Sequence, residues 1–89
     1  MGPTIRIKDR YFNYDNIVEI DFEIRQGKVG VQYIYDATFY IVNFLTTDRT
    51  IASIKLETLE EWENAKRKLE IGIINNYPFI QLTEDGKEE

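Results

Sequence analysis

The stretch from Thr38 to Thr46 constrains the fold most, because it alternates like a β-strand yet carries apolar side chains on both faces. The two alternating sets are Phe39, Ile41 and Leu45 on one face, and Tyr40, Val42 and Phe44 on the other. Such a strand is either central in its sheet or covered on its second face by another layer. One helix can cover only one face, so the pattern predicts a second covering element, such as a second copy of the chain.

Period-two alternation is clearest from Val18 to Arg25. The apolar face would carry Val18, Ile20, Phe22 and Ile24, and the polar face Glu19, Asp21, Glu23 and Arg25. This pattern predicts a half-buried antiparallel strand with an acidic solvent face. We expect a hairpin turn at Gln26–Gly27–Lys28. The returning strand would then line one face with Val29, Val31, Tyr33 and Tyr35.

Shorter segments complete the predicted sheet. Thr4–Lys8 alternates as a first strand, and the turn formers Asp15 and Asn16 predict a tight turn after it. Thr47–Asp48–Arg49 predicts a turn into a strand over Thr50–Leu56. The inward-facing side chains of that strand would be Ala52, Ile54 and Leu56.

An amphipathic helix is predicted after the strands. Thr58 and Glu61 have the spacing of a capping box at its start. Its apolar stripe would be formed by Leu59, Trp62, Ala65, Leu69 and Ile73. The helix should end near Asn75–Asn76, and Gly72 just before that end indicates either close packing or fraying. Pro78–Thr83 is a candidate for a short edge strand.

Together these elements predict an α+β fold, in which about five antiparallel strands form a meander-like sheet packed by one C-terminal amphipathic helix. A chain of 89 residues is expected to form one domain, assigned to residues 1–82. Residues 83–89 form a charged tail that is predicted to be disordered. Neither a signal peptide nor an apolar run long enough to span a bilayer is recognisable, so we expect a cytoplasmic protein that does not bind membranes.

The chain has no histidine, no cysteine and one serine, Ser53. These side chains are the usual nucleophiles, general bases and transition-metal ligands. Ser53 lies within a predicted strand without a neighbouring base motif, so it is interpreted as an ordinary strand serine. The composition therefore predicts a protein that is no enzyme and has neither a cofactor nor a metal ion.

The acidic face formed by Glu19, Asp21 and Glu23 is the strongest candidate for chemistry. Alternate residues of a strand place their carboxylates about 6.5–7 Å apart, which would suit a glycosidase-like pair or a bridging hard cation. The simpler interpretation is a solvated face whose charges prevent aggregation. The net charge of −5, with 16 acids against 11 bases, argues against nucleic-acid binding.

Aromatic residues predict an interaction surface, formed by Tyr33, Tyr35, Phe39, Tyr40 and Phe44. The alternative is that they simply suit a pleated sheet. The leading hypothesis is a small noncatalytic protein–protein interaction module that forms a homodimer or binds another protein. The second hypothesis is an acidic inhibitor or nucleic-acid mimic of phage or plasmid origin, suggested by the charge and the acidic face.

The segment from Tyr11 to Ile20, YFNYDNIVEI, resembles the opening of small bacterial and phage sheet-plus-helix proteins. In those proteins a Y-x-N-x-D-N-I strand opening precedes a hairpin and a terminal amphipathic helix. The resemblance covers about two-thirds of the chain in the order and spacing of elements. An Asp-Gly turn expected between the last strands is replaced here by Asp48–Arg49. The resemblance implies a fold and assigns no site.

Overall fold

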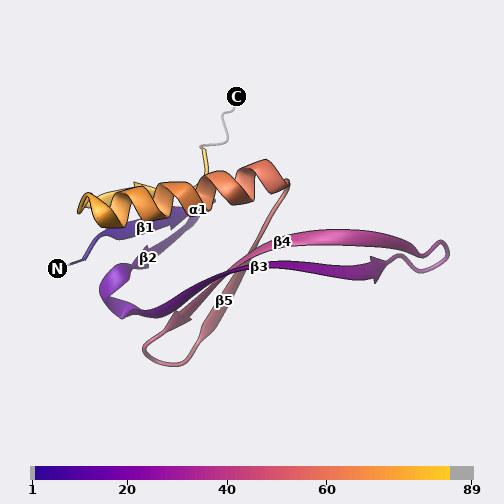
Figure 1. Ribbon diagram of the computed structural model, residues 1–89. Helices are drawn as coiled ribbons and strands as arrows, with labels where there is room; N and C mark the ends of the chain where they lie inside the picture. The colour runs from indigo at the N-terminus through magenta and orange to yellow at the C-terminus, as the bar shows by residue number, and fades with distance from the viewer. Residues whose placement is uncertain (1, 85–89) are drawn as a thin grey trace.

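Figure 1 shows the computed structural model of the chain, which describes residues 2–84. The described residues form an α+β fold with six strands and an α-helix, as the sequence predicts for the class and for the position of the helix. In chain order the elements are β1 (Thr4–Ile7), β2 (Arg10–Asn13), a 3-10 turn η1 (Tyr14–Asn16), β3 (Ile17–Val29), β4 (Tyr35–Thr46), β5 (Ile51–Leu56), α1 (Leu59–Ile74) and β6 (Phe79–Gln81).

The strands form two three-stranded sheets, which corrects the expected single sheet of about five antiparallel strands. The predicted antiparallel meander is present as β3–β4–β5. In the other sheet β1 is central, antiparallel to β2 and parallel to β6. The tight turn at Lys8, with a φ of 54°, folds β2 back onto one edge of β1, and β6 occupies the other edge, so β1 does not join the meander. Alternation predicted that β1 is a strand, but it carries no information about the partner of a strand.

The helix begins and ends where the sequence predicts. Thr58 Oγ1 accepts a hydrogen bond of 3.1 Å from the backbone N–H of Glu61, as the capping box requires. The Glu61 carboxylate reaches back to the N–H of Glu57 at 2.9 Å, one residue before the expected partner. Within the predicted stripe, Ala65 and Leu69 are buried, whereas Leu59 is exposed.

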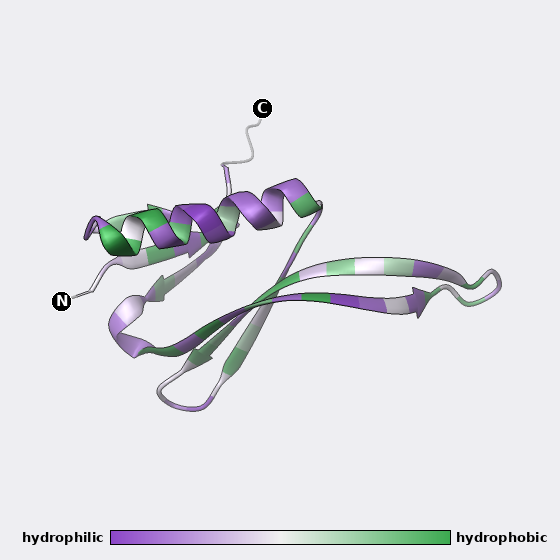
Figure 2. Ribbon diagram, in the orientation of Figure 1, coloured by the Kyte–Doolittle hydropathy of each residue, from purple (hydrophilic) through white to green (hydrophobic). Residues whose placement is uncertain are grey.

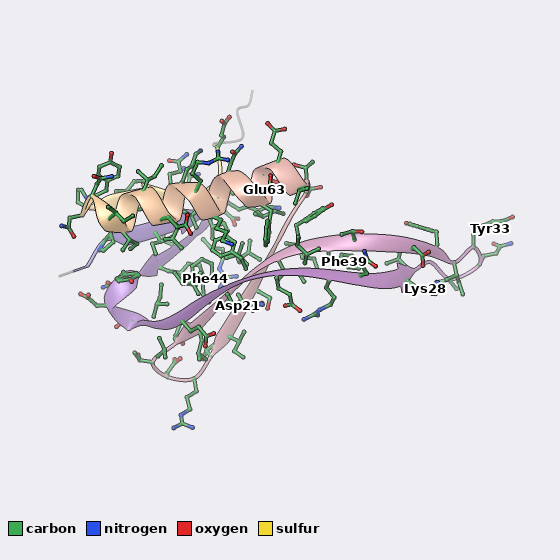
Figure 3. The ribbon with its side chains drawn as sticks, in the orientation of Figure 1. Asp21, Lys28, Tyr33, Phe39, Phe44 and Glu63 are labelled. Atoms are coloured by element: carbon green, nitrogen blue, oxygen red, sulfur yellow. The ribbon has the colours of Figure 1, made fainter. Side chains whose placement is uncertain are left out.

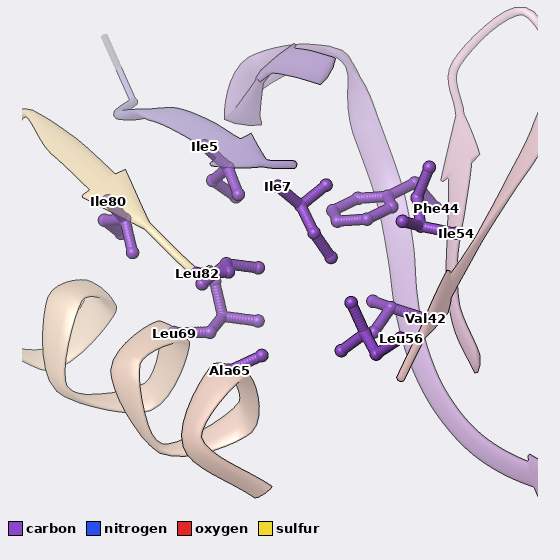
Figure 4. Close-up of a cluster of buried hydrophobic side chains, with 10 residues drawn as sticks. All are labelled: Ile5, Ile7, Val42, Phe44, Ile54, Leu56, Ala65, Leu69, Ile80 and Leu82. Atoms are coloured by element: carbon purple, nitrogen blue, oxygen red, sulfur yellow. The ribbon is translucent and has the colours of Figure 1, made fainter. Parts of the chain in front are cut away.

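One hydrophobic core fills the space between the two sheets and the helix (Figure 4). It contains Ile5, Ile7, Val42, Phe44, Ile54, Leu56, Ala65, Leu69, Ile80 and Leu82. The Phe44 ring stacks on the Phe12 ring with centroids 4.2 Å apart, which joins β4 to β2 across the interior. The second sheet therefore acts as a layer that the sequence did not reveal, and the helix is one wall of the core.

The hairpin turn lies further along the chain than the sequence suggests. β3 continues through Gln26–Gly27–Lys28, and Gly27 pairs with Ala37. Gly30 is the turn glycine instead: its φ is 111°, and a Cβ there would lie 2.0 Å from the Tyr33 carbonyl oxygen. Val31 and Tyr33 consequently lie in the loop between the strands and do not line a returning strand.

The β3–β4 hairpin projects from the rest of the molecule as a long two-stranded ribbon (Figure 1). β5 pairs with β4 only from Tyr40 to Leu45, so the outer part of the hairpin has no third strand. We call residues 25–39 the arm. The molecule is accordingly elongated, with principal extents of 50 × 34 × 21 Å. Figure 2 shows that the loop at the far end of the arm includes hydrophobic residues beside hydrophilic ones.

The C-terminal segment continues the β1–β6 pairing past β6. The N–H of Leu82 donates to the Arg6 carbonyl at 2.8 Å, and Thr83 is buried, with its Oγ1 accepting from the Lys8 N–H at 2.7 Å. The rest of the predicted tail, residues 85–89, lies outside the described residues. Across residues 2–84, α1 lacks the length and hydrophobicity that a bilayer-crossing helix requires.

Replacing Gly72 with alanine should destabilise the fold, although alanine is the better helix former. An added Cβ would lie 2.6 Å from both Cγ1 and Cδ1 of Ile80, a buried side chain. Overpacking of this kind costs about 1–3 kcal/mol, against about 1 kcal/mol from helix propensity. We expect the G72A variant to lose about 1 kcal/mol of unfolding free energy in chemical denaturation.

The variant I80V provides the control, because it removes Cδ1, one of the two Ile80 atoms that the new methyl group would meet at 2.6 Å. The loss caused by G72A should be smaller in the I80V background than in the wild type. A G72A protein that is more stable than the wild type would show that α1 and β6 are not in close contact at this point.

Candidate interaction surface

The strand register divides the side chains of the arm between two faces. Gly27 pairs with Ala37, Val29 with Tyr35 and Arg25 with Phe39, so these side chains share the face that points away from the core. Two small residues therefore separate Tyr35 from Phe39 on this face. The opposite face continues the core side of the sheet and carries Gln26 and Lys28, paired with Thr38 and Asp36. Ile24, paired with Tyr40, lies on the same side directly before the arm.

The end of the arm carries four large hydrophobic side chains that are exposed, among them Tyr33, which Figure 3 labels at the far end of the hairpin. The exposed fractions are 98% for Val31, 79% for Tyr33, 66% for Ile34 and 62% for Tyr35. We call these four residues the tip. Lys28 and Asp36 flank it and form an ion pair across the hairpin, with Nζ and Oδ1 2.6 Å apart. No charged residue lies between them in the sequence.

The tip includes two residues of the predicted surface, Tyr33 and Tyr35, and two that the sequence analysis did not assign to it, Val31 and Ile34. A signal for the missed pair existed. Val31 and Ile34 are β-branched residues after a glycine in a run without charges, and a turn at Gly27 would place this run in a strand.

The other predicted surface residues lie apart from the tip. Phe39 is half-buried on the outward face, with the Lys55 ammonium 4.9 Å from its ring centroid. Tyr40 is half-buried on the core side. Phe44 is completely buried in the core, so it is removed from the predicted surface. Phe44 belongs to the inner half of β4, which the helix and the second sheet cover.

The acidic residues share one face, as the alternation predicts. Glu19, Asp21 and Glu23 pair with Leu45, Asn43 and Ile41 on the outward side of the meander. The three carboxylates are not equivalent. Glu23 Oε2 accepts two hydrogen bonds from the Arg25 guanidinium, at 2.8 and 3.0 Å, and Glu23 Oε1 accepts one of 3.0 Å from Asn43 Nδ2.

The network around Glu23 extends across all three strands of the meander. Ser53 Oγ on β5 donates to Asn43 Oδ1 at 2.6 Å, which orients the amide that donates to Glu23. The hydrogen bonds from Arg25 and then from Asn43 lower the pKa of Glu23 below its ordinary value, and burial opposes this shift. Ser53 therefore has an ordinary structural partner and no neighbouring base in this network.

The acidic face borders a shallow hollow of about 330 Å³, lined by Glu19, Asp21, Arg25, Asn43, Leu45, Ile51 and Ser53. Within residues 2–84, the acidic side chains do not form a group of three that could hold a metal ion. The guanidinium of Arg25 lies where a cation would compete for the Glu23 carboxylate. The arrangement is that of a polar network on an exposed sheet face.

The outer edge of β3 is the longest unpaired strand edge in the described part of the chain. β3 has 13 residues and lies at the end of the strand order β3–β4–β5, so its sheet pairs it with β4 alone. A bulge near Val18 shifts the register at its start, and Val18 is exposed there. Beside this start lies a second hollow, of about 230 Å³, lined mainly by Tyr14, Ile17, Val18, Ile20, Leu69 and Ile73.

Comparison of the chain with protein-family models, with curated proteins and with solved structures finds no match. The resemblance to small bacterial and phage sheet-plus-helix proteins accordingly stays a prediction.

The pKa of Glu23 should rise when Arg25 is replaced with glutamine, because the largest cause of its lowered value is then removed. Carboxyl titration followed by NMR measures this change directly. A lowered carboxyl pKa stabilises the fold above the ordinary glutamate pKa, and that contribution is lost as the pH falls through the lower folded value. The R25Q variant should therefore show a weaker loss of stability on acidification.

Asp48 is the internal control for this titration. Its pKa is also lowered, by hydrogen bonds from Thr46 and Thr50 in the β4–β5 turn, far from Arg25 in the sequence. It should titrate identically in both proteins. A wild-type Glu23 that titrates at the ordinary glutamate value would contradict the network.

Proposed function

We propose that this protein is a noncatalytic protein–protein interaction module that binds through its arm, with a second copy of itself as the partner. The observation that carries the proposal is the exposed apolar tip at the end of a projecting two-stranded ribbon. Contiguous apolar groups of this kind on a small protein usually mark an interaction site.

The composition of the tip supports a protein partner. Tyr33 and Tyr35 offer large, rigid contact area together with a polar hydroxyl group, a combination enriched at interfaces. Val31 and Ile34 add aliphatic surface. The absence of charge between Lys28 and Asp36 resembles the centre of an interface, where charged residues are depleted.

The strand architecture supports the same proposal. A two-stranded ribbon is only marginally stable in water, and three or more strands are needed for independent stability. The arm has two strands and two unpaired edges, because β5 pairs with β4 no further outward than Tyr40. An added partner would supply the missing strand or layer.

The noncatalytic part of the proposal depends on composition, because the whole chain contains neither histidine nor cysteine.

The second candidate, an acidic inhibitor or nucleic-acid mimic, has support from the net charge of −5 and from the shared face of Glu19, Asp21 and Glu23. The ion pair between Glu23 and Arg25 weakens this support. A basic partner would meet a guanidinium beside the carboxylates, where a phosphate mimic would need unbroken negative charge. The arm is therefore the better-supported binding surface.

Replacing Ile34 with serine should weaken self-association, because it removes apolar surface from the tip. Light scattering should give about 21 kDa for the wild type at micromolar concentration, twice the chain mass of 10.6 kDa. For I34S the measured mass should move toward that of the single chain. The matched control is I51S on β5, because Ile51 has an exposed fraction of 64% against 66% for Ile34 and lies outside the arm.

The control variant should keep the wild-type mass. Equal effects of I34S and I51S would contradict a role for the tip, and a wild-type protein that stays at the mass of one chain would contradict self-association.

A further inference from the structure

We propose that two copies of the chain pair along the free edges of their β3 strands, antiparallel, with a two-fold axis at Ile24. The inference rests on the proposed self-association and specifies its geometry. The two meanders would then join into one continuous six-stranded sheet, with each arm lying beside the body of the other copy.

The edge itself offers the backbone groups for this pairing. β3 is 13 residues long, and its sheet pairs only one of its two edges, so the other presents a row of N–H and C=O groups. A two-fold axis perpendicular to the sheet pairs two such edges in antiparallel orientation. The outward faces of the two copies then lie on the same side of the joined sheet, and so do their core sides. The opposite edge of the arm, residues 35–39 of β4, offers five residues.

The charges along β3 select the position of the axis. With the axis at Ile24, Glu23 of each copy lies opposite Arg25 of the other, and both cross-strand pairs are of opposite charge. Asp21 then lies opposite Gly27, diagonal to the same Arg25. Moving the axis by one residue to Glu23 would place Arg25 against Asp21 but Glu23 against Glu23, and moving it to Arg25 would place Arg25 against Arg25. Charge complementarity therefore favours Ile24 as the centre.

The centre of the edge is apolar and exposed. Ile24 has an exposed fraction of 47% and lies on the core side of the meander, directly before the arm. On the axis, the two Ile24 side chains would face each other directly, with Cβ atoms about 5 Å apart. The pairing would bury a side chain that the single chain leaves in water.

The length of β3 places the tip beside the start of β3 in the other copy. Val29, the last residue of β3 and the partner of Tyr35, follows Ile24 by five residues, about 17 Å along the strand, and would lie level with Glu19 of the other copy. The tip begins at this level and continues outward, toward the level of Ile17. At that level, outside the arm of the other copy, lies the hollow of about 230 Å³ beside Ile17 and Val18. The lining of this hollow is mainly apolar. An exposed apolar tip and an apolar hollow would thus lie at the same level.

Cysteine cross-linking tests the axis directly, because the chain has no cysteine of its own. In the I24C variant the two sulfur atoms would lie within disulfide distance across the axis, and mild oxidation should convert most of the protein to a covalent dimer. The control is Q26C on the same face of the same strand. Its two cysteines would be offset by four residues, about 13 Å along the strands, and should not cross-link.

Charge reversal tests the pairing register without oxidation. The variants E23R and R25E should each dissociate at least about tenfold more readily than the wild type, because like charges then face each other across the axis. An equimolar mixture of the two should form a heterodimer of wild-type affinity, since the two positive side chains of E23R then face the two negative side chains of R25E. Both variants lose the ion pair within the chain, so a role confined to the chain predicts no rescue on mixing.

The outcomes separate this inference from the proposed function. If the wild type is a dimer that I34S weakens, but I24C does not cross-link and mixing gives no rescue, the arm associates through another edge or face and the inference is overturned. If I24C and Q26C cross-link equally, the contact is nonspecific and the inference is again overturned. A wild type that is monomeric by light scattering overturns the proposed function itself.

Discussion

The shortness of β5 is the constraint on which the rest of the structure depends. β5 has six residues against twelve in β4, so the meander is three-stranded only along its inner half. A single residue, Glu57, separates the end of β5 from the Thr58 N-cap, and the chain then turns back over the core as α1. The β3–β4 hairpin continues without β5, and its outer half becomes the arm.

The two halves of the hairpin differ in how they are stabilised. In the inner half, Phe44 stacks on Phe12, and Trp62 fixes the helix to β4 by donating from Nε1 to the Ile41 carbonyl at 3.2 Å. The outer half has cross-strand pairs alone, such as the exposed Lys28–Asp36 ion pair, which contributes little in water. The same strand pair therefore supplies both the core of the fold and its projecting surface.

Charge on β3 has two effects in this account. Charged residues on an edge strand oppose indiscriminate pairing with other chains. Glu23 and Arg25 flank Ile24 with opposite signs, so one antiparallel register satisfies both of them while neighbouring registers bring like charges together. The edge is thereby protected against most partners and compatible with a copy of itself.

The sequence predicted the elements whose signals are local. Thr58 and Glu61 predicted the start of the helix, and Thr47–Arg49 predicted the β4–β5 turn. The sequence could not predict that β1 pairs with β6. Ile5 and Ile80 are distant in the sequence, and alternation does not identify which strands pair with each other. The turn was misassigned because Gly27 and Gly30 are equally permissive, and only Gly30 adopts a positive φ. The acidic face was identified from alternation, whereas Phe44 was mistaken for a surface residue because the second covering sheet was not foreseen.

The central claim is that the arm is completed by association, and amide hydrogen exchange at two protein concentrations tests it most directly. Where the dimer predominates, amides of β3 within the arm should be protected. On dilution to the monomer that protection should fall, while the amides of Val42 and Phe44 in the body should be unaffected. Protection of the arm that is the same at both concentrations would contradict the account.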